Sequence, residues 1–296
     1  MIKQIYSCFN KNIKLIANDI SIDLAKLEFW LKRDCPNVKT LNNDEKVEHS
    51  IICENSTIEP QCITNNISTI LKGDFKECET WFAKFISQMF QKLLIEDGII
   101  FLNSSCVAFN KEAILILGDF GQGKTSTAIG VCEYFKKSIL LSDNYVAVKN
   151  SCIIGITDYL SVRNENNYVQ NKIDYNDLVL NINNRDFYKT KVNKNIDYKI
   201  KKIIVPFVNV GDENFHIISK EESSWYLYQK LCRLINGETV LFNGSLPSPI
   251  LNNEVISKKI LDISNNYLIN NNILYASSSV ENIAKYICNI LGWNNE

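Results

Sequence analysis

Histidine and glycine are scarce in this sequence of 296 residues, and neither sign of charge prevails. The only two histidines, His49 and His216, leave little for a zinc site or a histidine-based catalytic triad. Lysine and arginine number 32 against 33 aspartates and glutamates, for a net charge of −1. No basic surface therefore argues for a nucleic-acid partner. A glycine-rich motif rarely arises by chance in a chain with only 11 glycines.

Long apolar runs and paired cysteines are also missing. No apolar run approaches the roughly 20 residues that a membrane-spanning helix needs. Lys3 and Gln4 interrupt the apolar start, so we expect no secretory leader. The ten cysteines include no Cys-x-x-Cys pair, and many lie in apolar runs such as residues 51–53. This pattern predicts buried free thiols in a reducing cytoplasm, and a protein with no membrane and no nucleic-acid partner.

Residues 118–125 read Gly-Asp-Phe-Gly-Gln-Gly-Lys-Thr, a complete GxxxxGK[ST] phosphate-binding motif. The apolar run 113–117 predicts a buried strand before it, and 125–135 predict a helix after it, with apolar residues on one face. In this context backbone N–H groups and the helix N-terminus bind phosphate, Lys124 reaches the β- and γ-phosphates, and Thr125 can bind Mg²⁺. The residues predicted to bind the nucleotide are Gly118, Asp119, Phe120, Gly121, Gln122, Gly123, Lys124, Thr125 and Ser126, the last with helix capping as its alternative role.

Asp143 is the candidate acidic partner of this loop. It follows an apolar strand 19 positions after Lys124, which leaves room for one helix and one strand to return beside the loop. Two roles are open for the carboxylate: a Mg²⁺ ligand, or the base that accepts a hydroxyl proton. The alternative is that residues 142–144, Ser-Asp-Asn, form an ordinary hairpin turn.

The pattern predicts two domains. Residues 1–97 are expected to form a smaller α+β domain that docks a partner or presents a substrate, and residues 98–296 the phosphate-loop domain. In the first domain we predict a hairpin of residues 2–9 and 13–17, followed by a helix over 19–31 that Asp19 or Ser21 caps. We also predict strands at 47–53 and 67–71 and a helix at 78–95.

In the second domain we predict an extended segment at 99–102, followed by an antiparallel hairpin of 106–109 and 113–117 that leads directly into the phosphate loop. Residues 164–198 are polar and weakly periodic, and we expect a partly mobile excursion there with a short helix near 177–182. A strand broken by Pro206 is expected over 200–210. Helices are predicted at 221–234, 253–267 and 280–291.

About sixty residues of this domain resemble the catalytic domain of the HPr kinase/phosphorylase family, which shares its phosphate-loop core with phosphoenolpyruvate carboxykinases. The segments that carry the resemblance are 107–110, 114–118, 121–125 and 141–146, and residues 159–163 resemble a segment that follows this core in small relatives found beside peptide-modification pathways. The resemblance implies an α/β domain with a mixed, partly antiparallel sheet, of the HPr kinase C-terminal type. It also implies a kinase that uses ATP and Mg²⁺ and phosphorylates a hydroxyl, with a serine of a small protein or peptide as the expected acceptor.

The sequence departs from that family at several positions. Asn144 replaces the second aspartate of the family pair, and an amide can accept from water or a metal but cannot act as a base. Asn103 or Ser104 replaces a frequent family histidine, and the long glycine-rich segment of the bifunctional enzymes is missing, which argues against phosphorylase activity. Lys124 and Asp143 remain as the predicted catalytic residues, and Thr125 and Asp143 as the predicted Mg²⁺ ligands.

Arg163 is the preferred clamp on substrate or transferred phosphate, because it follows an apolar strand that leaves the core, and Asn144 is a second candidate. Lys201, Lys202 and Arg233 are further cations that could serve, each with a solvated surface role as its alternative. Two other functions stay open: a nucleoside triphosphatase or nucleotide-gated regulator, and a binding module without transferase activity. Relatives in the family are commonly oligomeric, so a homo-oligomer is also an open expectation.

Overall fold

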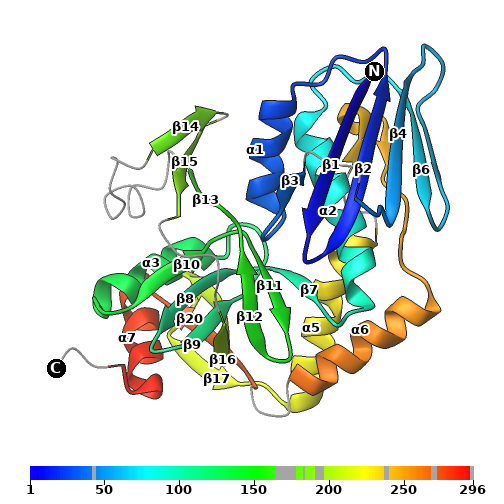
Figure 1. The fold of residues 1–296 in the computed structure, drawn as a ribbon. Helices are drawn as coiled ribbons and strands as arrows, with labels where there is room; N and C mark the ends of the chain where they lie inside the picture. Colours follow the sequence, from blue (N-terminus) through cyan, green and yellow to red (C-terminus); the bar gives the residue numbers. More distant parts are fainter. Residues whose placement is uncertain are drawn as a thin grey trace. The chain divides into compact units, whose positions relative to one another are not determined.

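The computed structural model describes residues 1–41, 45–163, 178–182, 184–190, 197–236, 240–267 and 272–293. These residues form a mixed α/β protein with two compact units (Figure 1). Unit 1 contains residues 1–100 and 228–262, and unit 2 contains residues 101–227 and 263–296. The predicted α/β class is therefore confirmed, and each unit is described by itself below.

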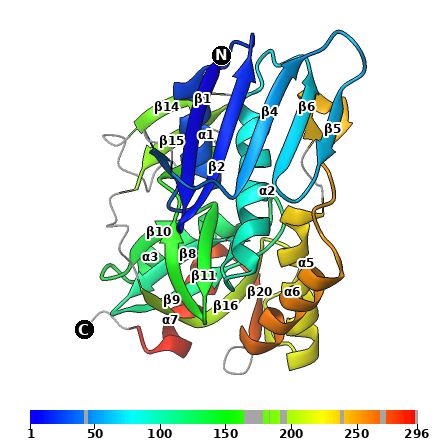
Figure 2. The same ribbon diagram turned by 45° about the vertical axis from the view of Figure 1, so that its right-hand side comes forward.

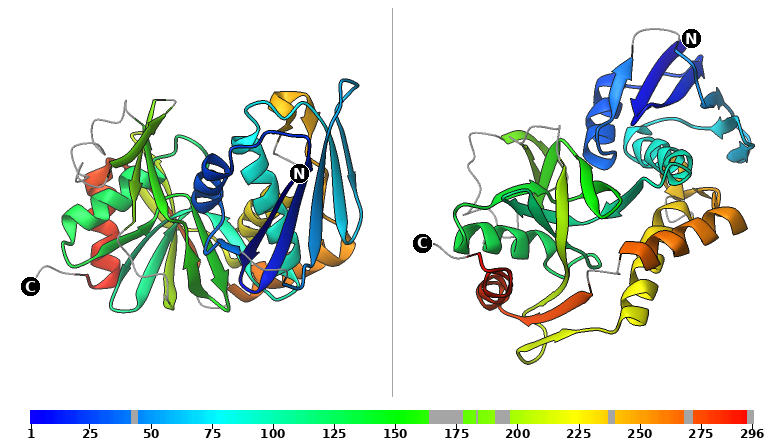
Figure 3. Two further views of the ribbon diagram at one scale, coloured as in Figure 1. Left: turned by 45° about the horizontal axis from the view of Figure 1, so that its top comes forward. Right: turned by 60° about the horizontal axis from the view of Figure 1, so that its bottom comes forward.

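Unit 1 is built on a six-stranded mixed sheet with strand order β3-β1-β2-β4-β6-β5. Figure 2 shows β1, β2, β4, β6 and β5 side by side, and helices α1 and α2 cover one face of the sheet (Figure 3). The elements are β1 (Ile2–Cys8), β2 (Lys11–Asn18), α1 (Leu24–Asp34), β3 (Lys39–Leu41), β4 (His49–Asn55), β5 (Gln61–Thr64), β6 (Ser68–Gly73) and α2 (Glu79–Ile95). The predicted hairpin, strands and long helix of this region are confirmed.

The cap of α1 differs from the prediction. Asp23 is the N-cap, and its carboxylate accepts a hydrogen bond from the backbone N–H of Lys26, so the helix begins several residues after Asp19 and Ser21. Asp19 instead has a positive φ of 53° and lies in the turn that ends β2. A helix begins where a side-chain oxygen accepts a hydrogen bond from a free backbone N–H of the first turn. Several residues near this start have such an oxygen, so the sequence alone does not decide between them.

A late segment that the sequence predicts as part of the second domain packs in unit 1. It contains the end of α5 (Lys220–Ile235), then β18 (Val240–Leu241), η2 (Phe242–Gly244), β19 (Leu246–Pro247) and much of α6 (Glu254–Tyr267). The ring of Phe242 lies edge-on to Phe75 at 5.3 Å and covers Gly73, where an added Cβ would lie 2.5 Å from the ring. Asn243 donates a hydrogen bond to the carbonyl of Lys76. Aromatic burial thus fixes this late segment to β6 and its following turn.

Unit 2 contains a nine-stranded mixed sheet whose path is β10-β8-β9-β16-β12-β11-β7, with β20 paired to β16 and β17 paired to β20. A smaller sheet has the order β13-β15-β14. The elements are β7 (Ile100–Asn103), β8 (Ser105–Phe109), β9 (Glu112–Ile116), α3 (Lys124–Tyr134), β10 (Ile139–Ser142), β11 (Tyr145–Lys149), β12 (Cys152–Ile156), β13 (Tyr159–Arg163), β14 (Leu178–Ile182), β15 (Arg185–Lys189), β16 (Tyr198–Val208), β17 (Asn214–Ile217), β20 (Ile273–Ser278) and α7 (Val280–Leu291).

In the large sheet, β9 and β20 each pair with β16 and run parallel to it. Strand β8 pairs antiparallel with β9, which confirms the predicted hairpin before the glycine loop. The predicted break at Pro206 is wrong: β16 runs through it, and Pro206 pairs with Ala276 of β20. Pairing of β16 with β9 ends at Ile204, so Pro206 lies beyond that ladder and its missing N–H removes no bond to β9.

The predicted short helix near 177–182 is also wrong, because residues 178–182 form β14. They pair antiparallel with β15, and β15 pairs with β13. Most of the rest of the predicted excursion, residues 164–177, 183 and 191–196, lies outside the described residues. Pairing with β15 decides the structure of residues 178–182, and weak helical periodicity does not.

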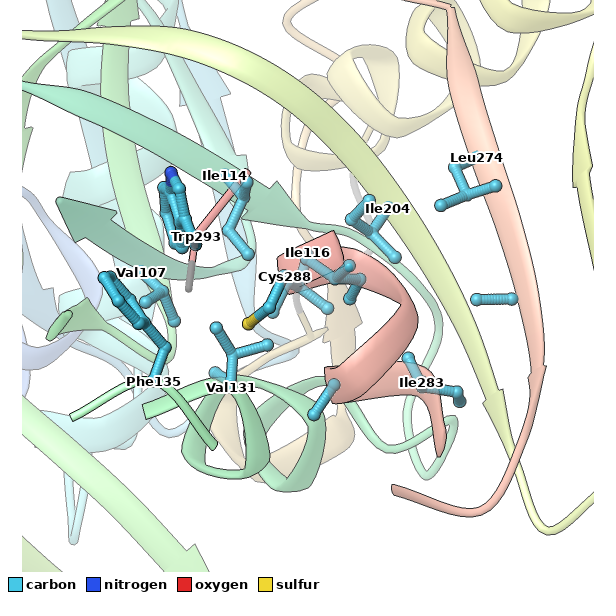
Figure 4. Close-up of a cluster of buried hydrophobic side chains, with 14 residues drawn as sticks. Val107, Ile114, Ile116, Val131, Phe135, Ile204, Leu274, Ile283, Cys288 and Trp293 are labelled. Atoms are coloured by element: carbon cyan, nitrogen blue, oxygen red, sulfur yellow. The ribbon is translucent and has the colours of Figure 1, made fainter. Parts of the chain in front are cut away.

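The core of unit 2 lies between the large sheet and helices α3 and α7, which pack side by side (Figure 3). Figure 4 shows Val131 of α3, and Phe135 just after this helix, in one cluster with Ile114 and Ile116 of β9 and with Ile283 and Cys288 of α7. Phe135 also meets Phe109 edge-on at 4.8 Å. This apolar layer holds the helix that follows the glycine loop against the strand that precedes it.

The ten cysteines, all within the described ranges, are free thiols, and seven of them are buried. Burial raises the pKa of Cys132 to about 11 and the pKa of Cys288 to about 12, so neither side chain is a thiolate at neutral pH. In the part of the chain that the structure describes, no helix is long and apolar enough to cross a membrane.

His49 makes the stability of unit 1 depend on pH. Its side chain is 1% exposed and lies 2.9 Å from the hydroxyl of Thr69, and burial lowers its pKa to about 4. Between pH 7 and pH 5 the unfolded chain takes up a proton at this residue that the folded chain does not. We expect the free energy of unfolding to fall by about 1–2 kcal/mol more in the wild type than in His49→Gln over this range. Urea denaturation of both proteins at the two pH values measures the difference, and equal losses would contradict the buried neutral histidine.

Candidate functional site

The glycine loop joins the end of β9 to the start of α3, and three of its glycines, Gly118, Gly121 and Gly123, have positive φ values. Gly121 and Gly123 have φ values of 84° and 94°, in the left-handed region that favours glycine. A Cβ on Gly123 would lie 2.3 Å from Cγ2 of Val208, at the end of β16. The backbone N–H of Val208 donates to the carbonyl of Gln122 at 3.4 Å. The loop therefore lies directly against the carboxyl end of the neighbouring parallel strand.

Lys124 folds back over this loop. Its Nζ atom donates to the carbonyl oxygen of Gly118 at 3.1 Å and to that of Asp119 at 3.0 Å. Gly123 is the N-cap of α3 and has no side chain with which to cap the helix. An ammonium group and the N-terminal amides of α3 thus lie at one short loop, and both attract an anion. This arrangement fits a phosphate group.

Asp143 lies at the same edge of the sheet as the loop. Strand β10 is antiparallel to β8, and β8 is antiparallel to β9, so β10 and β9 point in the same direction. Ser142 pairs with Cys106, which in turn pairs with Leu115 of β9. Asp143 is therefore level with the end of β9 and separated from it by two strand spacings, about 10 Å. The side chain is 7% exposed.

Strand β13 connects this carboxylate to the glycine loop. The backbone N–H of Ser161 donates to Oδ2 of Asp143 at 3.0 Å. Two residues further along the same strand, the guanidinium of Arg163 lies over the ring of Phe120, 3.9 Å from its centroid. Phe120 belongs to the loop and is 74% exposed. Asp143 and the loop are thus both in contact with one five-residue strand.

Of the four cations predicted to bind substrate or transferred phosphate, the structure places one in contact with the loop. Arg163 contacts the loop through Phe120. Lys201 forms an ion pair of 2.8 Å with Glu112, at the start of β9 and so at the opposite end of that strand from the loop. Lys202 pairs with Ile114 within the sheet, and burial lowers its pKa. Arg233 belongs to unit 1.

Asn144, the other candidate clamp, is half-buried beside Asp143, and its carbonyl accepts a hydrogen bond from the N–H of Ser104 at 2.8 Å. This backbone bond fixes the turn after β10, in the position where the alternative prediction placed a hairpin turn. Strands β10 and β11 do not pair with each other: β10 pairs with β8, and β11 with β12. The turn therefore passes between two parts of the sheet, and it directs Asp143 toward β13.

Two residues of this site were not found from the sequence. Arg185, at the start of β15, donates from Nη1 to the hydroxyl of Ser161 at 2.9 Å. Ser161 in turn contacts Asp143. The pairing of β13 with β15 brings Arg185 to the site from 24 residues away in the chain. A single sequence carries little signal for a pairing of that kind.

The described residues of this site could supply only a minority of the ligands that a Mg²⁺ ion needs. Among them, no three or more histidine, cysteine, aspartate or glutamate side chains gather as a metal site. The hydroxyl of Thr125, at the half-buried start of α3, and the buried carboxylate of Asp143 are oxygen ligands of the kind that Mg²⁺ takes together with phosphate and water. The site residues thus suit a metal that arrives with a nucleotide.

No protein-family model matches this chain, and no curated protein matches it either.

Two glycines of the loop allow a matched test. Gly121→Ala and Gly123→Ala both place a side chain at a positive φ, which costs about 1–2 kcal/mol. Only Gly123→Ala also places a Cβ against Val208, since nothing lies within 4 Å of the Cβ position at Gly121. We expect Gly123→Ala to lower the melting temperature further than Gly121→Ala. Equal shifts in thermal melts of the two variants would show that the contact with Val208 does not shape the loop.

Proposed function

We propose that this protein is an ATP- and Mg²⁺-dependent kinase related to HPr kinase. It transfers the γ-phosphoryl group to a hydroxyl, that of a serine in a small protein or peptide. The observation that carries the proposal is the shared contact of β13 with Asp143 and with the glycine loop. A phosphate-binding loop and a buried carboxylate at one sheet edge are the parts that phosphoryl transfer needs.

Each residue has a defined part in the proposed reaction. The loop amides, the N-terminus of α3 and Lys124 bind the β- and γ-phosphates. Thr125 and Asp143 would hold Mg²⁺, and the ion would supply positive charge near the transferred group. Asp143 also orients the acceptor hydroxyl and takes its proton. Arg163, held over Phe120, adds positive charge on the side of the loop that faces solvent.

The resemblance of residues 98–160 to the HPr kinase family supports the same proposal. The hairpin β8–β9, the loop, α3, and β10 with its terminal Asp143 follow one another in the order of the family pattern. Asn144 leaves a single carboxylate at the end of β10. A kinase needs one base, so this departure is compatible with transfer from ATP. The serine acceptor comes from the resemblance alone.

Transfer of radiolabel tests the proposal. The wild type is incubated with [γ-³²P]ATP, Mg²⁺ and serine-containing peptides encoded beside its gene. We expect a labelled peptide, a loss of at least about 100-fold in its rate of formation in Asp143→Asn, and a similar loss in Lys124→Ala with weaker ATP binding. Asp143→Asn keeps the size of the side chain, removes its charge and its capacity to act as a base, and leaves one oxygen that can accept from Ser161.

Asp262→Asn, an exposed carboxylate of α6, is the matched control and should leave the rate unchanged. Free phosphate without a labelled peptide would replace the kinase by a nucleoside triphosphatase. Full labelling in Asp143→Asn would exclude the carboxylate from the reaction.

A further inference from the structure

The hydrogen bonds around β13 point beyond the residues that the motif supplies. We propose that Arg185 is a positioning residue: through Ser161 it holds the carboxylate of Asp143 in the orientation that binds Mg²⁺ with the nucleotide. This inference rests on the proposed function, because it concerns the metal and nucleotide of the same site. It assigns a role to a residue outside every segment that carries the resemblance.

Two hydrogen bonds link the arginine to the acid. Nη1 of Arg185 donates to Oγ of Ser161 at 2.9 Å, and the backbone N–H of Ser161 donates to Oδ2 of Asp143 at 3.0 Å. The guanidinium therefore lies within about 10 Å of the carboxylate, through a single serine. One oxygen of Asp143 is fixed by this contact, which sets the direction of the carboxylate plane. Hydrogen bonds to a metal-binding carboxylate commonly orient it in this way.

Strand register explains why Arg185 turns toward Ser161. Arg185 pairs directly with Arg163, and side chains of paired residues lie on the same face of a sheet. Two guanidinium groups so placed repel each other. Arg163 lies over the ring of Phe120, and Arg185 reaches Ser161, the diagonal neighbour two residues before Arg163. The two arginines are thereby separated, one toward the loop and one toward Asp143.

The other face of these strands is already held by apolar packing. Val162 of β13 and Tyr188 of β15 are buried against Ile129 of α3 and Leu140 of β10. The adjacent acid, Asp186, accepts hydrogen bonds from Asn181 and from the hydroxyl of Tyr188. Because this face anchors β13 to α3 and β10 without Arg185, loss of the bond between Arg185 and Ser161 leaves the strand in place, and its effect falls on the local position of Ser161 and so on the carboxylate that Ser161 contacts. Loss of this bond should change metal binding more than folding.

The test measures how much Mg²⁺ tightens the binding of a fluorescent ATP analogue, mant-ATP, by titration with MgCl₂ present and with EDTA in its place. For Arg185→Met we expect the Mg²⁺-dependent gain in affinity to fall about 10-fold, with the affinity in EDTA unchanged. Ser161→Ala should give a similar loss. The double variant should lose no more than either single one, since both substitutions break the same link. Arg185→Lys, which can still donate to Ser161, should recover part of the gain.

Lys189→Gln is the matched control, because Lys189 is an exposed cation at the other end of β15. It should keep the full gain, and thermal melts should show similar stability for all variants. An unchanged gain in Arg185→Met, or additive losses in the double variant, would overturn the positioning role while leaving the kinase proposal intact. A wild type that does not bind mant-ATP at all would overturn the proposed function and this inference together.

Discussion

The contact between the glycine loop and the end of β16 is the constraint on which the candidate site depends. Gly123 approaches Val208 so closely that no side chain fits between them. This contact exists because β9 and β16 are adjacent parallel strands that end at the same edge. It fixes where α3 begins, and therefore where its N-terminal amides and Lys124 lie. The apolar layer between α3, α7 and the sheet then holds that arrangement in place (Figure 4).

A second constraint acts on the acidic side of the site. Strand β10 returns parallel in direction to β9 although β8 lies between them, so Asp143 reaches the same sheet edge as the loop. The small sheet of β13, β15 and β14 contributes further contacts to this site. It places one backbone amide on Asp143 and one guanidinium on the loop residue Phe120. Its inner face packs on α3 and β10, which makes these contacts part of the fold.

The elements that the sequence predicts well are those with strong local patterns. The helix at α2 has an apolar stripe over its whole length, and β9 is an apolar run that a glycine motif ends. The predictions failed where a neighbour decided the outcome. Pro206 continues a strand because it lies beyond the ladder with β9, and residues 178–182 form a strand because β15 pairs with them. The cap of α1 shifted to Asp23 because several nearby side chains offered the same chemistry.

The sequence by itself determined the glycine motif, Lys124, Thr125 and the acidic end of β10, because each is encoded in a short stretch with a strand or helix beside it. Only the tertiary structure decided that Arg163 lies on the loop, that Lys201 lies at the opposite end of β9 from it, and that Arg185 reaches Asp143 through Ser161. The physical reason is the register between strands. Local pattern sets which residues form a strand, but pairing between distant segments sets which side chains become neighbours.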